Sequence, residues 1–521
     1  CAVQRLARLP LGEQREPFWD EVSGFLVARA AELGHREVAV LCNAYAAGAP
    51  EHLAGPPGSA LLRRAAELAE DFGAQDLTMV AHGLARAAAP KAAEAGGAEG
   101  RAVLRLAQAA RAVRLEEGRP QQAALLLNAF VRLRHMRDAE LFGRCFAVAR
   151  RSLAAWDSQA LALLCNAFAG AGRRAREAAC DEGWRDVAGR CAAVVQGADV
   201  KHLACMAHAL ARVGAPAAAV AEFYEVLEQF LCSKPRVNDF LSAQDIAMLA
   251  HGLARHRRPS RPMPAGEEEA GVLSAPEDLT PGTPWPLEEY AARRMREFTP
   301  QGLASVLHAS TRLRRGGEPL FAALAARLRV CRGRLLGPEL ALACSSAAEA
   351  ACAVGPKRAH GLLRDLRKEC LRLLPALSPW QVAYVATAYA DAAAAARAAG
   401  TSPRFWQGQA QARAFLEGLL ARAEEVLPDP GRLAQVRAQA RCIAEAEGLL
   451  LAGCGEAQGL LAPGGGEAAA AGKLLAGSSS GDTAATCEGE GLASDAEPAV
   501  AVAGPRRSPT AGAGDDCRRV Y

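Results

Sequence analysis

The chain has 521 residues and a formal net charge of +4, and hydrophobic residues make up 51% of it while aromatic residues make up only 5%. This length exceeds what one compact core supports, so several domains or an elongated repeat array are expected. Ala, Leu and Arg favour helices, and alternating β-branched runs are scarce, so the composition excludes a β-rich fold and predicts an all-α protein. The sequence contains no uninterrupted run of 18 apolar residues, so no membrane span is expected.

An internal repeat is the main feature of the sequence. Nine segments share a template in which a cap-like residue is followed, nine positions later, by a polar anchor residue and then by a small residue. In chain order the segments are 34–46, 73–86, 119–132, 157–170, 199–212, 242–255, 299–312, 337–350 and 378–391. Their anchors are Asn43, His82, Asn128, Asn166, His208, His251, His308, Ser346 and Thr387. A tenth, degraded copy is predicted to begin at Asp429.

Each template segment is predicted to form the first helix of a two-helix unit. Side chains that can cap a helix start stand at its beginning, at Asp157, Asp199, Ser242, Thr299 and Ser378. Proline, which the first helical position tolerates, follows at Pro300, Pro338 and Pro379. Amphipathic segments at 139–153, 221–231, 318–330 and 413–427 are predicted to form second helices. Because one pair cannot bury its apolar face alone, the pairs are expected to stack into a right-handed α-α superhelix of about nine repeats, similar to HEAT and armadillo arrays.

Composition divides the chain into four parts. N-terminal helical repeats are expected over 1–255 and C-terminal helical repeats over 287–451. Between them, 256–286 is rich in Pro, Gly and Glu and is predicted to be a disordered insertion. Residues 452–521 are rich in Gly, Ala and Ser and are predicted to be a disordered, low-complexity tail. The 16 cysteines include no CxxC pair, so buried free thiols are expected rather than disulfides or a zinc site.

The polar anchor of the template lies in an otherwise apolar helix, where an unsatisfied polar group would be costly. The interpretation we favour is structural: each anchor hydrogen-bonds the backbone of the neighbouring repeat and fixes the stacking register. The alternative is functional, and in it the Asn and His anchors contact RNA bases.

A second column of residues follows the anchors by four positions, which places both on one helix face. It consists of Arg86, Arg132, Arg212, Arg255 and Arg312. Stacked helices would align these guanidinium groups, which suits a phosphate backbone. Equally, each arginine could simply offset the dipole at a helix C-terminus. Arginine is absent at Ala47, Gly170, Ala350 and Asp391, so an RNA track is expected from the second repeat to the seventh.

Template helices of the form L-A-x-L-A-H/N-A/G-L/F-A-R resemble the repeats of organellar RNA-binding proteins, over roughly 20–445. The similar groups are octotricopeptide and heptatricopeptide repeats, FAST-kinase-like (RAP-type) proteins, and the helical-repeat subunit of the kinetoplastid RNA-editing substrate-binding complex. The resemblance implies an α-solenoid that acts in RNA stability, processing, editing or ribosome assembly. It implies a place in the mitochondrial matrix or the plastid, and a targeting peptide would lie before Cys1.

The chain also departs from these families. Many relatives end in a small nuclease-like RAP domain, whereas the composition after residue 452 does not predict one. The repeats lack the Trp, Gly and Tyr pattern of tetratricopeptide repeats and the strict period of pentatricopeptide repeats. A code of one base per repeat is therefore not predicted.

The functional expectation is a non-enzymatic RNA-binding scaffold in mitochondrial RNA processing, stability or editing. The motifs GxxxxGK[ST], GxGxxG and HExxH do not occur, so no catalytic residue, metal ligand, cofactor or small-molecule substrate is predicted. Single-stranded RNA is the expected partner. The alternative is a HEAT- or armadillo-like protein–protein scaffold, and a third reading joins both in a subunit of a ribonucleoprotein complex.

Overall fold

The computed structural model describes residues 14–449 with gaps, together with residues 3, 5 and 7. The gaps are 88–97, 114, 116–119, 136–137, 172–175, 234–239, 257–285, 314–316, 351–355, 399, 401–404 and 407. The predicted disordered insertion therefore lies outside the described residues except at its two ends, and the predicted disordered tail lies wholly outside them. The described residues belong to one compact unit, to which the following description applies.

The described residues form helices and turns without a strand, which confirms the all-α prediction. Ten of the 20 α-helices in this part of the chain carry the repeat template and are called template helices. They are α3 (His35–Gly48), α5 (Ala74–Ala87), α7 (Pro120–Arg132), α9 (Ser158–Gly170), α12 (Val200–Val213), α14 (Ala243–His256), α16 (Pro300–Arg312), α18 (Gly337–Glu349), α21 (Pro379–Ala398) and α23 (Pro430–Ala446). The last of these is the degraded tenth copy predicted from Asp429.

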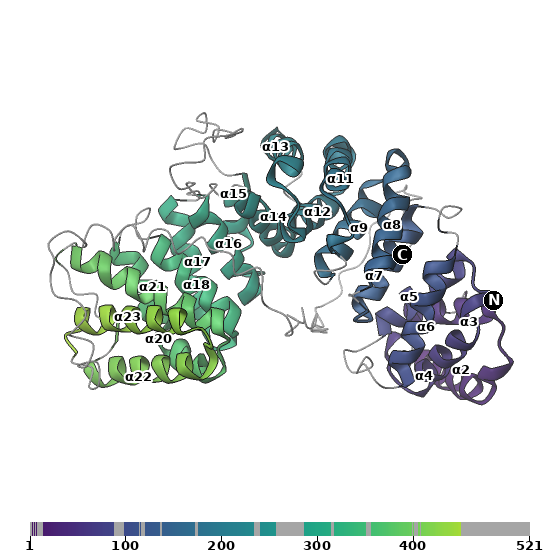
Figure 1. The fold of residues 1–521 in the computed structure, drawn as a ribbon, viewed down its shortest axis with the longest axis horizontal. Helices are drawn as coiled ribbons and strands as arrows, with labels where there is room; N and C mark the ends of the chain where they lie inside the picture. The colour runs from purple at the N-terminus through teal and green to yellow at the C-terminus, as the bar shows by residue number, and fades with distance from the viewer. Residues whose placement is uncertain are drawn as a thin grey trace. The chain divides into compact units, whose positions relative to one another are not determined.

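The other ten α-helices alternate with the template helices along the chain and are called partner helices (Figure 1). They are α2 (Arg15–Arg29), α4 (Pro56–Glu67), α6 (Ala98–Ala112), α8 (Ala139–Arg151), α11 (Asp181–Val194), α13 (Ala217–Ser233), α15 (Pro286–Arg293), α17 (Gly317–Cys331), α20 (Pro356–Leu373) and α22 (Gln409–Val426). The series begins with the partner helix α2, which precedes the first template helix.

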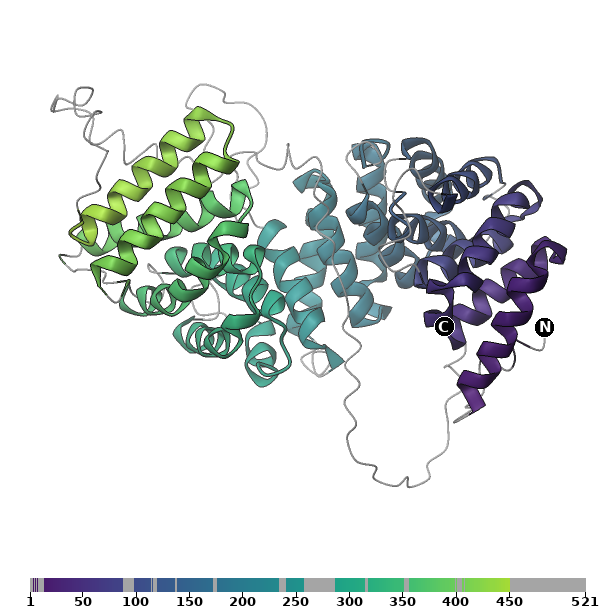
Figure 2. The same ribbon diagram turned by 90° about the horizontal axis from the view of Figure 1, so that it is seen from below.

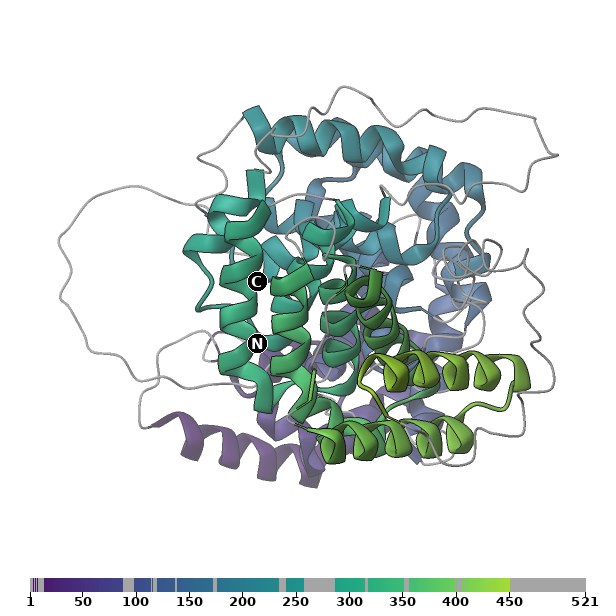
Figure 3. The same cartoon turned by 90° about the vertical axis from the view of Figure 1, so that its left-hand side faces the viewer.

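Each template helix packs against the next one, from α3 on α5 through to α21 on α23. In the N-terminal half partner helices pack on partner helices, as α4 does on α6 and α11 on α13. In the C-terminal half α17, α20 and α22 pack mainly on the template helices α16, α18 and α23, and Figure 2 shows the last of these contacts as the yellow-green pair. Figure 3 shows the last pair, α22 and α23, side by side in yellow-green. Buried side chains of both series form one continuous apolar cluster. This arrangement is a helical solenoid, in which each pair covers the apolar face of its neighbour.

The predicted helix caps are largely confirmed. Asp157 accepts a hydrogen bond from the amide of Ala160 at 2.8 Å, and Asp199 and Thr299 cap α12 and α16 in the same way. Ser242 forms a reciprocal capping box with Asp245.

Two details of the predicted caps are wrong. The hydroxyl of Ser378 is buried without a partner among the described residues, and only the reciprocal half of a capping box forms, in which the side chain of Gln381 accepts from the Ser378 amide at 2.9 Å. Pro338 occupies the second position of α18, because that helix begins one residue earlier than expected, at Gly337.

The cysteines confirm the expectation of buried thiols. The 11 cysteines within the described ranges are free, and seven of them are buried. None of the helices that the structure describes is long and apolar enough to cross a membrane.

Candidate nucleic-acid interface

The anchor residues form a ladder that connects successive template helices. Asn166 Nδ2 donates to Asn128 Oδ1 at 3.3 Å, and Ser346 Oγ lies 3.4 Å from His308 Nδ1. In the last repeat, Thr387 Oγ1 accepts from Gln439 Nε2 of α23 at 2.8 Å. At these three places side-chain bonds of the anchors therefore join neighbouring repeats.

The predicted partner of the anchors needs correction, because these bonds join side chain to side chain and do not reach the backbone of the neighbouring repeat. Ser346 and Thr387 also donate to carbonyls of their own helices, those of Leu342 and Ala383. Exposure varies along the ladder: Ser346 is fully buried, Asn166 is exposed, and Asn43 and His82 are half-buried.

The arginine stripe lies at the C-terminal ends of the template helices. Its members are Arg86, Arg132, Arg212, Arg255 and Arg312. The first four are exposed and the fifth is half-buried. Within the described part of the chain, the side chains of Arg86, Arg132 and Arg212 have no ion pair and no hydrogen bond. Arg312 differs from them, because its Nη1 lies 3.7 Å from the carboxylate of Glu349.

Two histidine anchors, His208 and His251, lie among these arginines, and the pKa of each ring is strongly lowered. Burial lowers the pKa of His208 to about 3, and the charges of His251, Arg212 and Arg255 contribute to the shift. The pKa of His251 is lowered to about 4 by burial and by Arg255 and Arg212. Each ring is thus influenced by guanidinium groups from two neighbouring helices, so the stripe continues from α12 to α14.

The same arrangement recurs between α5 and α7. Burial lowers the pKa of His82, and the charges of Arg86 and Arg132 lower it further. Two neighbouring template helices therefore again bring their arginines to one imidazole ring.

Arg176 belongs to this surface, although the repeat template does not predict it. The stripe is interrupted at Gly170 of α9, and Arg176 follows in the connection to α11. Its Nη1 donates to the carbonyl oxygen of Arg212 at 3.2 Å. The pKa of Arg212 is lowered by burial and by the charges of Arg176 and Arg255. The signal in the sequence was a basic run directly after Gly170, at 173–176.

The charge on the template face changes sign after α16. Asp391 of α21 occupies the stripe position, and burial raises the pKa of its carboxyl group. Burial also raises the pKa of Glu349 in α18. The charge of Arg312 lowers this pKa, and the charge of Asp391 raises it. A row of phosphate contacts is therefore compatible with α5 to α16 and unfavourable beyond α16. The arginine pattern of the sequence predicts the same limits, from the second repeat to the seventh.

An apolar column runs beside the ladder and the stripe. Three residues before the anchors of α5, α7, α9, α12 and α14, half-buried apolar side chains stand at Met79, Leu125, Leu163, Cys205 and Met248. Spacings of three and four residues place this column, the anchor and the arginine on one helix face. The face therefore offers apolar surface, neutral hydrogen-bonding groups and cations in parallel rows.

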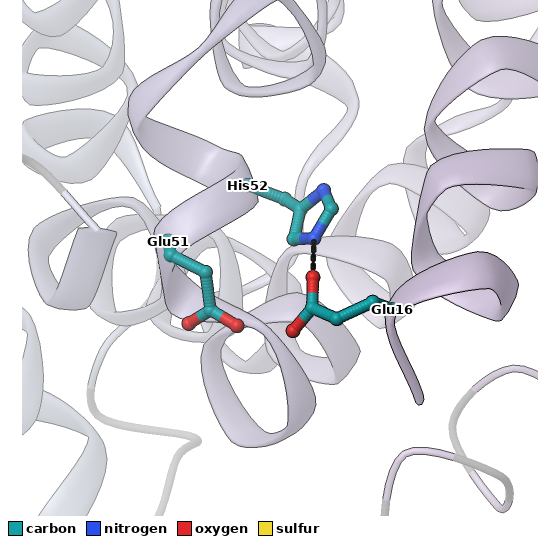
Figure 4. A group of neighbouring side chains, drawn as sticks. All are labelled: Glu16, Glu51 and His52. Carbon is teal, nitrogen blue, oxygen red and sulfur yellow. Dashed lines mark ion pairs between the residues drawn. The ribbon is translucent and has the colours of Figure 1, made fainter. Parts of the chain in front are cut away.

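A separate polar group near the N-terminus joins residues that the repeat pattern does not connect (Figure 4). Glu16 lies in the first turn of α2, whereas Glu51 and His52 lie in the 3-10 helix η3 (Pro50–Ala54). Their potential ligand atoms lie within 4.8 Å of one another. His52 Nε2 is 3.5 Å from Glu16, and Arg15 Nη2 is 3.5 Å from Glu51. Each carboxylate thus has a neighbouring partner, which explains the group as a surface ion-pair network.

Comparison with known proteins assigns no family. No protein-family model and no curated protein matches the chain. Among solved structures, a homology model of the full-length AP-3 complex in an intermediate open conformation is similar at 11% identity and a TM-score of 0.27, over 82% of this chain and 69% of that one. A circular tandem repeat protein with novel repeat topology is similar at 16% identity and a TM-score of 0.18, over 86% and 94% of the two chains. Neither match indicates a partner.

Proposed function

We propose that the chain is a non-enzymatic helical-repeat scaffold that binds single-stranded RNA along the arginine stripe. One observation carries the proposal: Arg86, Arg132 and Arg212 are exposed and have no acidic partner among the described residues. Guanidinium groups held in a row repel one another, and a polyanion with regularly spaced charges relieves that repulsion. The repeat provides these groups from successive helices.

The neighbouring columns favour a single strand over a duplex. Bases of a single strand are free to stack on side chains and to expose their edges, whereas those of a duplex are paired and stacked on each other. The half-buried apolar column of the template face supplies contact surface for such bases, and the neutral histidines supply hydrogen-bonding groups. A role in organellar RNA processing, stability or editing is part of the proposal and rests on the resemblance of the repeat motif.

A protein partner on the C-terminal template helices is the second candidate function. Tyr384 of α21 is 38% exposed, and its ring lies edge-on to Trp380 with centroids 5.6 Å apart. Exposed aromatic side chains are enriched at protein interfaces, and the nearby Asp391 disfavours phosphate. A chain that binds RNA over α5 to α16 and protein over α21 would act as a subunit of a ribonucleoprotein complex.

The test is fluorescence-anisotropy binding of the full chain to a labelled single-stranded RNA, between about 50 and 200 mM salt. The first variant replaces the five stripe arginines with Gln. The control variant makes the same charge change on partner helices, at the exposed residues Arg63, Arg105, Arg151, Arg185 and Arg413. We expect steep salt dependence in the wild type and the control, and its loss in the stripe variant. Equal loss in both variants, or no binding by the folded wild type at low salt, would refute the proposal.

A further inference from the structure

The densest part of the arginine stripe lies between α12 and α14. His208 and His251 are the anchors of these helices, and their ring centroids are 5.2 Å apart. Arg212 and Arg255 follow them by one helical turn, and Arg176 reaches the same place from the connection after α9. Three guanidinium groups and two imidazole rings from three segments of the chain therefore share one small surface.

We propose that Arg176, Arg212, Arg255, His208 and His251 form a phosphate subsite whose occupation is coupled to proton uptake by the two histidines. The identity of its natural ligand, a phosphate of bound RNA, rests on the proposed function. The subsite itself rests on the geometry of these five side chains.

The argument for an anion begins with the arginines. Arg212 is exposed, and its side chain has no acidic partner in the described part of the chain. Arg176 is held beside it through the bond to the Arg212 carbonyl. The fold thus holds like charges near one another, and both Arg176 and Arg255 make the charged form of Arg212 less favourable. A phosphate placed among them would turn this repulsion into attraction, because guanidinium groups bind phosphate oxygens with charge-assisted hydrogen bonds.

The argument for proton uptake concerns the histidines. The charged groups that act on the rings are Arg212 and Arg255, together with the other ring in the case of His208. The anchors of the two flanking template helices are the uncharged Asn166 of α9 and His308 of α16. The partner helix α13 contributes Tyr224, whose hydroxyl donates to the Ala207 carbonyl. Among the described residues of the free protein, therefore, cations and burial act on the two rings, and both oppose the imidazolium form.

A bound phosphate changes the sign of the local potential. It favours the imidazolium form and raises the pKa of both rings above the values of about 3 and about 4 in the free protein. At pH values between the histidine pKa values of the free protein and those of the complex, the complex then holds more protons than the free protein. By linkage, affinity must rise as the pH falls through that interval.

The experiment measures binding of the full chain to two probes, a labelled single-stranded RNA and inorganic tripolyphosphate, at constant salt from about pH 8 to about pH 5.5. The test variant is His208→Asn with His251→Asn, because asparagine occupies the same template position at Asn128 and Asn166. The control variant is His35→Asn with His202→Asn, which changes two histidines that are not anchors. Calorimetry in two buffers of different ionisation enthalpy counts the protons taken up.

We expect the wild-type and control affinities for both probes to rise roughly threefold or more over this range, with measurable proton uptake. The test variant should keep its affinity at the high-pH end within about twofold and lose the part of the proton uptake that depends on the histidines, which is the difference from the wild type with the same probe. The same pH dependence in the wild type and the test variant, or none in the wild type, would overturn the subsite.

The two probes separate this inference from the proposed function. If tripolyphosphate binds with histidine-dependent proton uptake and RNA does not bind, the subsite stands and the RNA proposal fails. If RNA binds with a steep salt dependence but without histidine-dependent proton uptake for either probe, the RNA proposal stands and the subsite fails. If neither probe binds the folded protein, both are refuted.

Discussion

A Cβ atom added to Gly252 in α14 would lie 2.7 Å from the carbonyl oxygen of Ala207 in α12. The same relationship recurs in an earlier repeat, where a Cβ on Gly83 would lie 2.6 Å from the carbonyl oxygen of Cys42. In both places a glycine that directly follows an anchor packs on a neighbouring template helix. It meets the residue that directly precedes the anchor of that helix. This contact explains why the repeat template requires a small residue directly after each anchor.

Gly252→Ala should therefore destabilise the protein, because α14 must move away from the backbone of α12. We expect a loss of about 1–3 kcal/mol in the free energy of unfolding, measured by chemical denaturation. The control is Gly189→Ala in α11, where an added Cβ meets nothing within 4 Å. That change should be neutral or stabilising, since alanine favours a helix. Equal effects of both changes would contradict the packing explanation.

Arg132→Gln and Arg312→Gln should weaken RNA binding unequally. Arg132 has no ion partner among the described residues, whereas Arg312 is paired with Glu349 and is already partly neutralised. We expect Arg132→Gln to reduce the slope of log affinity against log salt by about 1, as for the loss of one phosphate contact. The slope should change less in Arg312→Gln. A salt titration of both single variants decides this, and equal slopes would be inconsistent with the proposed track.

Asp138→Ala should be among the more destabilising single changes in the N-terminal half. Asp138 caps α8 through the Leu141 amide at 3.0 Å, and its buried carboxylate receives two bonds from Arg111 and lies 3.0 Å from His135. Removing it leaves the Leu141 amide and His135 without this partner and leaves Arg111 with the exposed Glu140, and we expect a loss of about 2–4 kcal/mol in chemical denaturation. A loss below about 0.5 kcal/mol would show that the network contributes little.

The same carboxylate should make stability depend on pH. Burial by itself would raise the pKa of Asp138, but the bonds from Arg111, Leu141 and His135 outweigh burial and lower it. A carboxyl group with a lowered pKa stabilises the folded state above its unfolded pKa, and this contribution is lost as the pH falls through the folded pKa. The stability difference between the wild type and Asp138→Asn should therefore shrink as the pH is lowered below about 4.

Asp391→Asn should have the opposite pH dependence. Burial raises the pKa of Asp391, so ionisation of this carboxyl group costs more in the folded state than in the unfolded state. The variant should be slightly more stable than the wild type at neutral pH, by less than about 1 kcal/mol, because solvent screens part of the effect at the protein surface. This gain should shrink as the pH falls through the folded pKa and vanish well below about 4, where the carboxyl group is protonated in both states. Denaturation at the two pH values measures it, and a gain that persists at low pH would contradict the assignment.

The sequence by itself determined the local features of this protein. Helix position, most caps, the anchors and the arginines recur at fixed offsets within one template, because helical periodicity and capping depend on residues only a few positions apart. Those offsets place Asn166, Gly170 and their counterparts on one face before any tertiary contact is known.

Only the tertiary structure decided which groups from different repeats meet. It paired Asn166 with Asn128 through their side chains, neutralised Arg312 with Glu349, and brought Arg176 to Arg212. These partners lie 36 to 38 residues apart along the chain. Their contact depends on how one helix pair is rotated and displaced on the next, and that stacking is fixed by packing across the whole interface between repeats, which no local pattern specifies.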